Sequence, residues 1–184
     1  MKAEVVKGWP RDNAIRILLK DTDSSQVNAI RRALISDVPK LAITRVNITQ
    51  GVVENDGQIM ESVNVLPDEV LAHRLAMIPI PTFTDDNIYF TENCEECMYK
   101  ADTEKGCQQC QIIYSLNVQG PAPDSEQQTV TVYAEDLTTV SDQKYDILEE
   151  HKRIPLTILS KGQYLELYAL ARMGRGGAHQ KWCP

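Results

Sequence analysis

The sequence predicts an α+β fold in which many strands are accompanied by two short helices. Most periodic segments alternate apolar and polar residues, which is the spacing of strands whose two faces differ. Only two segments, 24–38 and 68–77, repeat apolar residues at the spacing of a helix. Strands and helices do not alternate regularly and no internal repeat is found, so the pattern favours α+β over a βαβ architecture.

The predicted strands are separated by short turns and by longer polar connections. Asn55-Asp56-Gly57 predicts a hairpin turn, and Lys161-Gly162 predicts a turn between the last two strands. Residues 85–110 are polar and lack apolar periodicity, so we expect a loop. We expect residues 136–150 to be irregular and 173–184 to form a glycine- and cation-rich tail. The predicted strands are 14–20, 41–49, 60–65, 112–118, 130–134, 155–159 and 163–171.

The first predicted helix has an apolar stripe with an arginine, Arg31, beside it. Ser24 or Ser25 can cap its start, and Pro39 ends it. Arg31 lies at the edge of the stripe, where burying a charge without a partner is costly. This helix is therefore predicted to meet another protein. The stripe consists of Val27, Ile30, Leu34 and Val38.

The second helix repeats this arrangement. Pro67 suits its first position and the acidic side chains of Asp68 and Glu69 suit its first turn. Arg74 lies within its apolar stripe. A long arginine stem can extend from an apolar edge to solvent, which is the alternative explanation for either helix. The repetition in two helices favours an interface, where arginine's fixed donor geometry is useful. The stripe consists of Val70, Leu71, Leu75 and Ile78.

The composition of the chain limits the classes of protein to which it can belong. The chain has 184 residues, enough for one or two domains, and 42% of them are hydrophobic. Its net charge of −7 argues against a chain-wide nucleic-acid surface. No apolar run reaches the roughly 18 residues of a membrane helix, and the first residues lack a signal-peptide pattern. An intracellular protein without membrane contact is expected.

Four of the five cysteines form two CxxC pairs separated by nine residues, Cys94/Cys97 and Cys107/Cys110. Four thiolates match a closed, structural zinc site, which is the favoured interpretation. An iron–sulfur cluster and a set of free thiols in a loop are the alternatives. Thioredoxin-like redox chemistry is weakly indicated, because neither pair follows a buried strand and opens a helix.

No catalytic constellation is found. His73, His151 and His179 are far apart and lack metal-ligand spacing. No GxSxG or P-loop motif is present, and the GRGG at 174–177 lacks a strand-to-helix context. The sequence therefore predicts no active site, and the chain is not expected to be an enzyme in isolation.

Three motifs, in order, resemble the alpha-like assembly subunits of cellular RNA polymerases. They are NAIRRALISDVPKLAI from Asn28, LAHRLAMIPIP from Leu71 and ARMGRGGAHQKWCP ending at Pro184. The resemblance extends from about Asn13 to Pro184 and is nearest to the archaeal branch of this family. The third-largest subunit of eukaryotic polymerase II and, more distantly, bacterial alpha are similar.

The resemblance implies a fold in two parts. Residues 1–47 and 157–184 would form a dimerisation domain, and 48–156 an inserted, mainly-β second domain carrying the cysteine loop 94–110. The function implied is a non-catalytic assembly subunit of DNA-dependent RNA polymerase, a nucleotidyltransferase complex. The expected partners are a smaller alpha-like subunit in a heterodimer, the second-largest and largest subunits, and small zinc-bearing subunits, with little nucleic-acid contact. The compartment would be the archaeal cytoplasm, or the nucleus in a eukaryote.

The resemblance also nominates docking residues. Asn28, Arg31 and Arg32 match the motif of the first helix, and His73 and Arg74 match that of the second. The cysteine quartet stands where eukaryotic-type relatives carry a zinc loop. The tail residues carried over for contacts to the large subunit are Arg172, Arg175, His179, Lys181 and Trp182.

The chain departs from the family pattern in two ways. Archaeal relatives often insert an iron–sulfur domain after the Lys-Trp motif, where this sequence stops. The family's further strand and long C-terminal helix are also missing, so either the chain is truncated or another polypeptide supplies them. The rival functions are a free-standing zinc-stabilised adaptor or transcription regulator, and a redox enzyme using the CxxC pairs.

Overall fold

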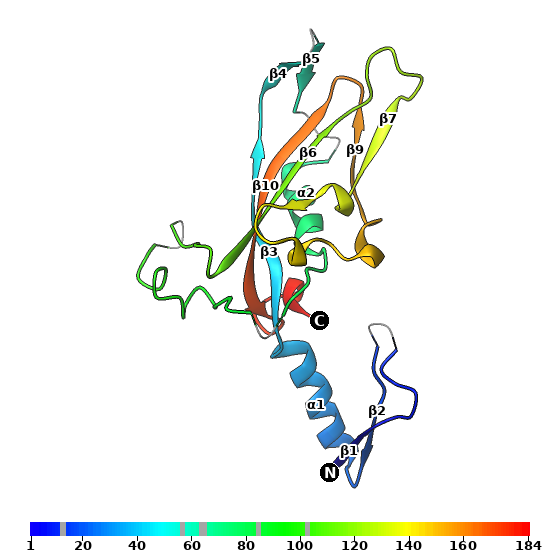
Figure 1. The fold of residues 1–184 in the computed structure, drawn as a ribbon, viewed down its shortest axis with the longest axis vertical. Coiled ribbons are helices and arrows are strands. Elements are labelled where there is room, and N and C mark those ends of the chain that lie inside the picture. The colour runs from blue at the N-terminus through cyan, green and yellow to red at the C-terminus, as the bar shows by residue number, and fades with distance from the viewer. Residues whose placement is uncertain (12–13, 56–57, 63–65, 84–85, 102–103) are drawn as a thin grey trace.

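The computed structural model describes residues 1–11, 14–55, 58–62, 66–83, 86–101 and 104–184. Within these residues the protein is mostly β, with two α-helices. Long strands form an upright body, from which the first helix and an N-terminal hairpin project downward and the cysteine loop projects sideways (Figure 1). No helix among the described residues is long and apolar enough to cross a membrane.

The body is organised around an antiparallel sheet of order β3-β10-β6-β8. These strands are β3 (Pro39–Thr49), β10 (Tyr164–Arg175), β6 (Gln111–Gln119) and β8 (Thr138–Thr139). β10 lies between β3 and β6 and pairs with both along most of its length. A register shift between Leu170 and Ala171 marks a bulge in β3, where the pairing passes over Thr44.

Smaller sheets extend this body. β4 (Val52–Asn55) and β5 (Gln58–Glu61) form the predicted hairpin, whose turn residues 56–57 lie outside the described residues. β7 (Thr129–Tyr133) pairs with β9 (Pro155–Ser160). The predicted strand at 60–65 is described only to residue 62, and β5 ends at Glu61.

The core lies between the main sheet, the β7–β9 pair and the helix α2 (Asp68–Ala76). Leu71 and Leu75 of α2 are completely buried, as the predicted stripe requires. Val70, assigned to the same stripe, is 40% exposed, so the buried face of the helix is narrower than expected. Pro67 is the N-cap of α2 and not its first helical residue.

Short 3₁₀ turns and the short strand β8 occupy much of the segment 136–150, which was expected to be irregular, and the residues just beside it. The turns are η1 (Ala134–Asp136), η2 (Gln143–Tyr145) and η3 (Glu149–His151). A further turn, η4 (Gln180–Trp182), closes the C-terminal tail. Tyr145 is buried, and its backbone oxygen accepts a hydrogen bond from the buried hydroxyl of Tyr114.

The helix α1 (Ser24–Ser36) differs from α2, because none of its residues is buried. Its cap is Asp23, whose carboxylate accepts from the N–H groups of Ser25 and Gln26, so the predicted serine cap was wrong. The helix ends at Ser36, and Pro39 opens β3 instead of ending the helix directly.

Two strand pairings were not foreseen from local patterns. β1 (Lys2–Val5) pairs with β2 (Ile17–Lys20), although no strand was expected at the N-terminus. β9 and β10 follow each other around the expected Lys161-Gly162 turn, yet they belong to different sheets.

The main sheet includes strands from both expected domains. β10 joins the N-terminal β3 to β6, so hydrogen bonds cross the expected domain boundaries at 48 and 156. The two-domain division stays a prediction.

Candidate metal centre and interaction surfaces

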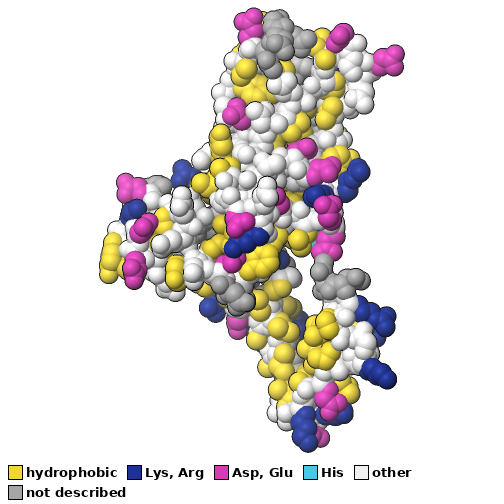
Figure 2. Space-filling model, in the orientation of Figure 1, with side chains coloured by type: hydrophobic (Ala, Val, Ile, Leu, Met, Phe, Trp, Pro, Cys, Tyr) yellow, Lys and Arg dark blue, Asp and Glu magenta, His cyan; other side chains and the backbone are white. Residues whose placement is uncertain are grey.

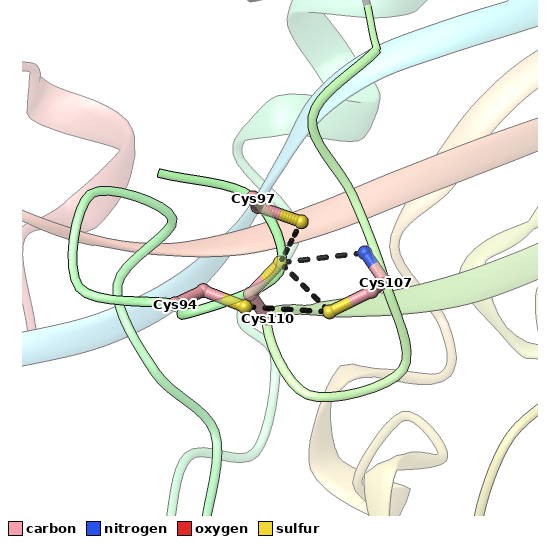
Figure 3. Close-up of side chains that lie close together, drawn as sticks. All are labelled: Cys94, Cys97, Cys107 and Cys110. Carbon is pink, nitrogen blue, oxygen red and sulfur yellow. Dashed lines mark hydrogen bonds between the residues drawn. The ribbon is translucent and has the colours of Figure 1, made fainter. Parts of the chain in front are cut away.

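The four clustered cysteines face one another within the loop between α2 and β6. Their sulfur atoms all lie within 4.8 Å of one another, and Figure 3 shows the four side chains converging from separate turns of the loop. Cys94 Sγ is 3.4 Å from Cys107 Sγ, and Cys110 Sγ is 3.7 Å from Cys97 Sγ. A tetrahedral ion with Zn–S bonds of about 2.3 Å places its sulfurs about 3.8 Å apart. The arrangement therefore fits one ion bound by four sulfurs.

Each CxxC pair is shaped by its own tight turn. The N–H of Cys97 donates to the carbonyl of Cys94, and the N–H of Cys110 donates to the carbonyl of Cys107. The N–H of Gly106 reaches Cys97 Sγ at 3.4 Å. The local backbone thus brings both sulfurs of a pair to the same side and directs a donor at one of them.

Burial and hydrogen bonding act in opposite directions on these thiols. The Gly106 N–H lowers the pKa of Cys97, whereas burial raises the pKa of Cys110 and raises that of Cys107 to about 12. Burying several negative sulfurs together is costly unless a cation compensates them. The cluster is thus chemically suited to a metal ion that stabilises the thiolate form.

The cysteine loop has its own small buried cluster, separate from the main core. Cys94, Cys97 and Cys110 are fully buried, with Cys107 packed against them. None of the five cysteines, all of which lie among the described residues, forms a disulfide. Because the cluster consists of sulfur ligands, a bound ion would supply the cross-link that apolar side chains supply elsewhere.

The face of α1 is apolar and uncovered. Leu34 is 57% exposed and Val27 is 40% exposed. The hairpin β1–β2 adds further exposed apolar side chains, and Figure 2 shows hydrophobic side chains gathered over α1 and this hairpin. Contiguous exposed apolar surface is typical of an interaction site. The other exposed apolar side chains of α1 and of the N-terminal segment that contains the hairpin are Val5, Val6, Ile15, Ile17, Leu18 and Ile35.

The arginines predicted for α1 are also exposed. Arg31 donates through Nε and Nη2 to Asn28 Oδ1, at 3.1 and 2.9 Å. This intrahelical contact orients the guanidinium without burying it, and Arg32 is exposed beside it. The expected charge buried on an apolar face is therefore not found on α1, all of whose residues are described. The partner roles of Asn28, Arg31 and Arg32 stay predictions.

On α2 the two predicted docking residues, His73 and Arg74, are both exposed. Arg74 donates through Nη1 to the carbonyl of Leu156 at 2.8 Å, which ties the helix to β9. It also lines a pocket of about 280 Å³ with Thr157 and Ile158. Arg74 therefore has a structural contact in this chain, and its partner role stays a prediction.

The tail packs against the end of α1 and the start of β3. The N–H of Gly177 donates to the carbonyl of Ser36 at 2.9 Å, which satisfies a backbone acceptor in the last turn of the helix. A Cβ at Gly176 would lie 2.1 Å from the carbonyl oxygen of Ile35, so this close approach requires glycine. The glycine-rich motif thus positions α1 on the body of the protein.

The remaining tail residues make several internal contacts. Trp182 Nε1 donates to the carbonyl of Arg172 at 3.1 Å, and Lys181 Nζ lies 4.5 Å from the Trp182 ring centroid. His179 packs edge-on against Trp182, and the Arg175 guanidinium lies 5.2 Å from the Phe90 ring centroid. The role assigned to these five tail residues in binding a larger partner stays a prediction.

Sequence reasoning missed the residues that support the cysteine cluster. Arg172 Nη2 donates to the carbonyl of Lys105, beside the metal-ligand candidates. Gly106 has φ +138° and lies against the Gln111 side chain. A glycine immediately before a CxxC pair was a usable signal for Gly106, because such glycines permit positive φ. No local pattern marks the contact of Arg172, which depends on strand pairing.

The class of protein follows from comparison with known sequences. The family model described as RNA polymerase Rpb3/RpoA insert domain matches residues 46–182, which include β10, α2 and the cysteine loop. The chain therefore belongs to this family of RNA polymerase alpha-like subunits, as the motifs predicted.

Several curated relatives carry matching names. The chain is 35% identical to DNA-directed RNA polymerase subunit Rpo3 of Picrophilus torridus over 94% of its own length and 57% of the relative's. It is 35% identical to subunit Rpo3 of Archaeoglobus fulgidus, over 95% and 55%. It is 32% identical to DNA-directed RNA polymerases II, IV and V subunit 3 of Arabidopsis thaliana, over 95% and 52%. The chain thus spans just over half the length of these relatives.

Proposed function

We propose that this chain is a non-catalytic assembly subunit of a DNA-dependent RNA polymerase, of the kind named Rpo3 in archaea. The observation that carries the proposal is the uncovered apolar face of α1, in a chain whose relatives are named as polymerase subunits. A helix with an apolar stripe and no buried residue requires a partner to cover it. The compartment is the cytoplasm of an archaeal cell, or the nucleus of a eukaryotic one.

The proposed partner for this face is a smaller alpha-like subunit, which would form a heterodimer through α1 and the β1–β2 hairpin. Residues 48–156 would form the inserted second domain of the family. Arg31 with Asn28, and Arg74 with His73, would contact the second-largest and largest subunits and the small zinc-bearing subunits. The exposure of Asn28, Arg31, Arg32 and His73 supports these roles, because their polar groups are accessible to a partner.

The cysteine cluster would hold one structural zinc ion through Cys94, Cys97, Cys107 and Cys110. Sulfur separations of 3.4 to 3.7 Å and the all-sulfur composition of this set support zinc over hard cations. When bound, zinc supplies a redox-inert cross-link between the two turns of the loop. Elemental analysis is expected to give about one zinc per chain. Iron with acid-labile sulfide would instead identify the iron–sulfur alternative.

Affinity purification of the tagged chain from its native cells tests the function. The proposal expects the large polymerase subunits and a smaller alpha-like subunit to co-purify with it. Recovery of the chain without any polymerase subunit would contradict the proposal and favour the free-standing adaptor or regulator.

A substitution on α1 tests the proposed dimer surface. Leu34→Glu places a charge in the exposed stripe and is expected to weaken heterodimer formation at least about 10-fold, because the charge would be buried on association. Ala29→Glu places the same side chain on the opposite face of the helix and is the matched control. Both variants should remain folded alone, since neither position is buried. Titration of each variant with the purified small subunit measures the affinity of the heterodimer. An equal loss of affinity in both variants would contradict the assignment of the dimer surface to this face of α1.

A further inference from the structure

One peptide group connects the cysteine cluster to the main sheet. Its N–H belongs to Gly106 and reaches Cys97 Sγ at 3.4 Å. Its carbonyl belongs to Lys105 and accepts a hydrogen bond from Arg172 Nη2. A cation on the carbonyl side and a sulfur on the N–H side hold the same peptide plane, and such linked hydrogen bonds strengthen each other. The orientation of this peptide therefore depends on Arg172.

Arg172 is held in place by the sheet. It lies on β10, paired with Gln111 of β6 on one side and Ala42 of β3 on the other. Gln111 directly follows Cys110, so the strand that carries this pairing also positions a sulfur of the cluster. The arginine thus stands beside both ends of the loop segment 105–110.

Buried polar atoms without hydrogen-bond partners indicate that Arg172 does more than stabilise the fold. Its Nε atom is buried without a hydrogen-bond partner among the described residues, and so is Oε1 of Gln111. A buried donor without a partner costs roughly 1 to 3 kcal/mol. An apolar side chain of similar length would avoid this cost but could not donate to the loop. The hydrogen bond from Nη2 to the Lys105 carbonyl is therefore the contribution that an arginine makes at this position.

The loop side of the contact is closely packed. A Cβ on Gly106 would lie 2.1 Å from Gln111 Oε1, so the peptide packs directly on that side chain. Its φ of +138° lies in a region that favours glycine. The Gly106 N–H is therefore aimed at Cys97 by packing on one side and by Arg172 on the other.

The same arginine also contacts the tail. Its carbonyl accepts from Trp182 Nε1 at 3.1 Å. The indole covers Gly174, where a Cβ would lie 2.1 Å from the Trp182 ring. Hydrogen bonds thus connect Cys97 through the 105–106 peptide to the Arg172 side chain, and the backbone carbonyl of the same residue connects it to the tail that packs on α1.

We propose that Arg172 is a positioning residue of the metal site, which fixes the peptide that donates to Cys97 and joins the metal-loaded loop to Trp182. This inference rests on the proposed metal site. Outer contacts that orient a ligand strengthen metal binding, and their loss typically lowers metal affinity about 10- to 100-fold. The tail surface beside α1 is therefore ordered in part by metal binding.

The test compares Arg172→Met with Arg153→Met in the full chain. Methionine keeps a long side chain and removes the donor, and Arg153 is an exposed arginine whose guanidinium lies 6.0 Å from the Tyr133 ring centroid. Zn²⁺ affinity is measured by competition with a chelator, and Co²⁺ spectra report sulfur coordination. Arg172→Met should bind Zn²⁺ about 10- to 100-fold more weakly, with Arg153→Met unchanged.

A second readout follows the tail. In a Trp9→Phe background, fluorescence reports Trp182 alone. Metal loading should change this emission in the parent chain and in Arg153→Met, and should change it much less in Arg172→Met. If the methionine variant does not fold without metal, Arg172→Lys replaces it in the test, because lysine keeps a charged donor. Its Zn²⁺ affinity is expected to fall by less than the roughly 10- to 100-fold expected for loss of the donor.

The possible outcomes distinguish failure of the positioning role of Arg172 from failure of the metal site. Four-sulfur metal binding with the same affinity in the parent chain, Arg172→Met and Arg172→Lys would overturn the positioning role and leave the metal site standing. A parent chain that binds neither Zn²⁺ nor Co²⁺ through its cysteines would overturn the metal site, and the positioning role with it. Weaker binding in Arg172→Met with an unchanged Trp182 response would overturn the link to the tail.

Discussion

At the scale of single residues, Gly106 is a position of the cysteine loop where any side chain would strain the backbone. Gly106→Ala adds a methyl group against the Gln111 side chain and requires a side chain at φ +138°. The backbone strain, of order 1 to 3 kcal/mol, should displace the N–H aimed at Cys97 and weaken zinc binding about 10-fold. Chelator competition measures this loss.

Gly162→Ala is the control for that substitution. Gly162 also has positive φ, at +73°, but the nearest atom to an added Cβ is Ile59 O at 4.0 Å and the site is remote from the cysteines. Alanine at Gly162 should lower thermal stability without changing zinc affinity. Equal effects of the two variants on zinc affinity would show that the Gly106 contact has no special role.

Residue identities were predictable where the chemistry is local. The CxxC spacing of Cys94, Cys97, Cys107 and Cys110 was enough to expect one site, and the four sulfurs do lie together. The contact of Arg172 with Lys105 was not predictable, because it joins residues 67 positions apart. It depends on the register of β10 against β6, which no local pattern determines.

At the scale of elements, α1 depends on its cap. The hydroxyl of Ser25 and the N–H of Gln26 lower the pKa of Asp23 from its ordinary 3.8. A carboxylate with a lowered pKa contributes stability that is complete above the ordinary value and is lost as the pH falls through the lowered one. Asp23→Asn keeps a capping oxygen but does not titrate, so it is the reference.

The expected result is a pH-dependent difference between the two proteins. The unfolding free energy of the parent, minus that of Asp23→Asn, should be constant above about pH 5 and fall below pH 3.8. Denaturant unfolding followed by circular dichroism measures the difference. A difference that does not vary with pH would show that the charge on Asp23 does not contribute to the cap.

The elements themselves were largely predictable, and their pairing was not. The apolar stripe of α1 and the helix at 68–77 follow from periodicity of the sequence. The exposure of the α1 stripe does not, since periodicity shows that a face is apolar without showing what covers it. The assignment of β9 and β10 to different sheets likewise reflects long-range packing, which overrides the short turn between them.

At the scale of the whole molecule, the cysteine loop and the main core are separate buried clusters. Metal removal should therefore release the loop while the main sheet stays folded. Hydrogen exchange with and without a chelator is expected to show faster exchange of the Gly106 and Cys110 amides. Amides at the centre of β10 should remain protected, and global unfolding on chelation would contradict this separation.

The place of β10 in the chain has a consequence for synthesis on the ribosome. It is the strand between β3 and β6, yet its residues follow both of theirs in the sequence. Until residues 164–175 have emerged, β3 and β6 lack their shared neighbour and present unpaired strand edges. The sheet can therefore close only after β10 has emerged, and until then the exposed edges of β3 and β6 depend on protection from aggregation.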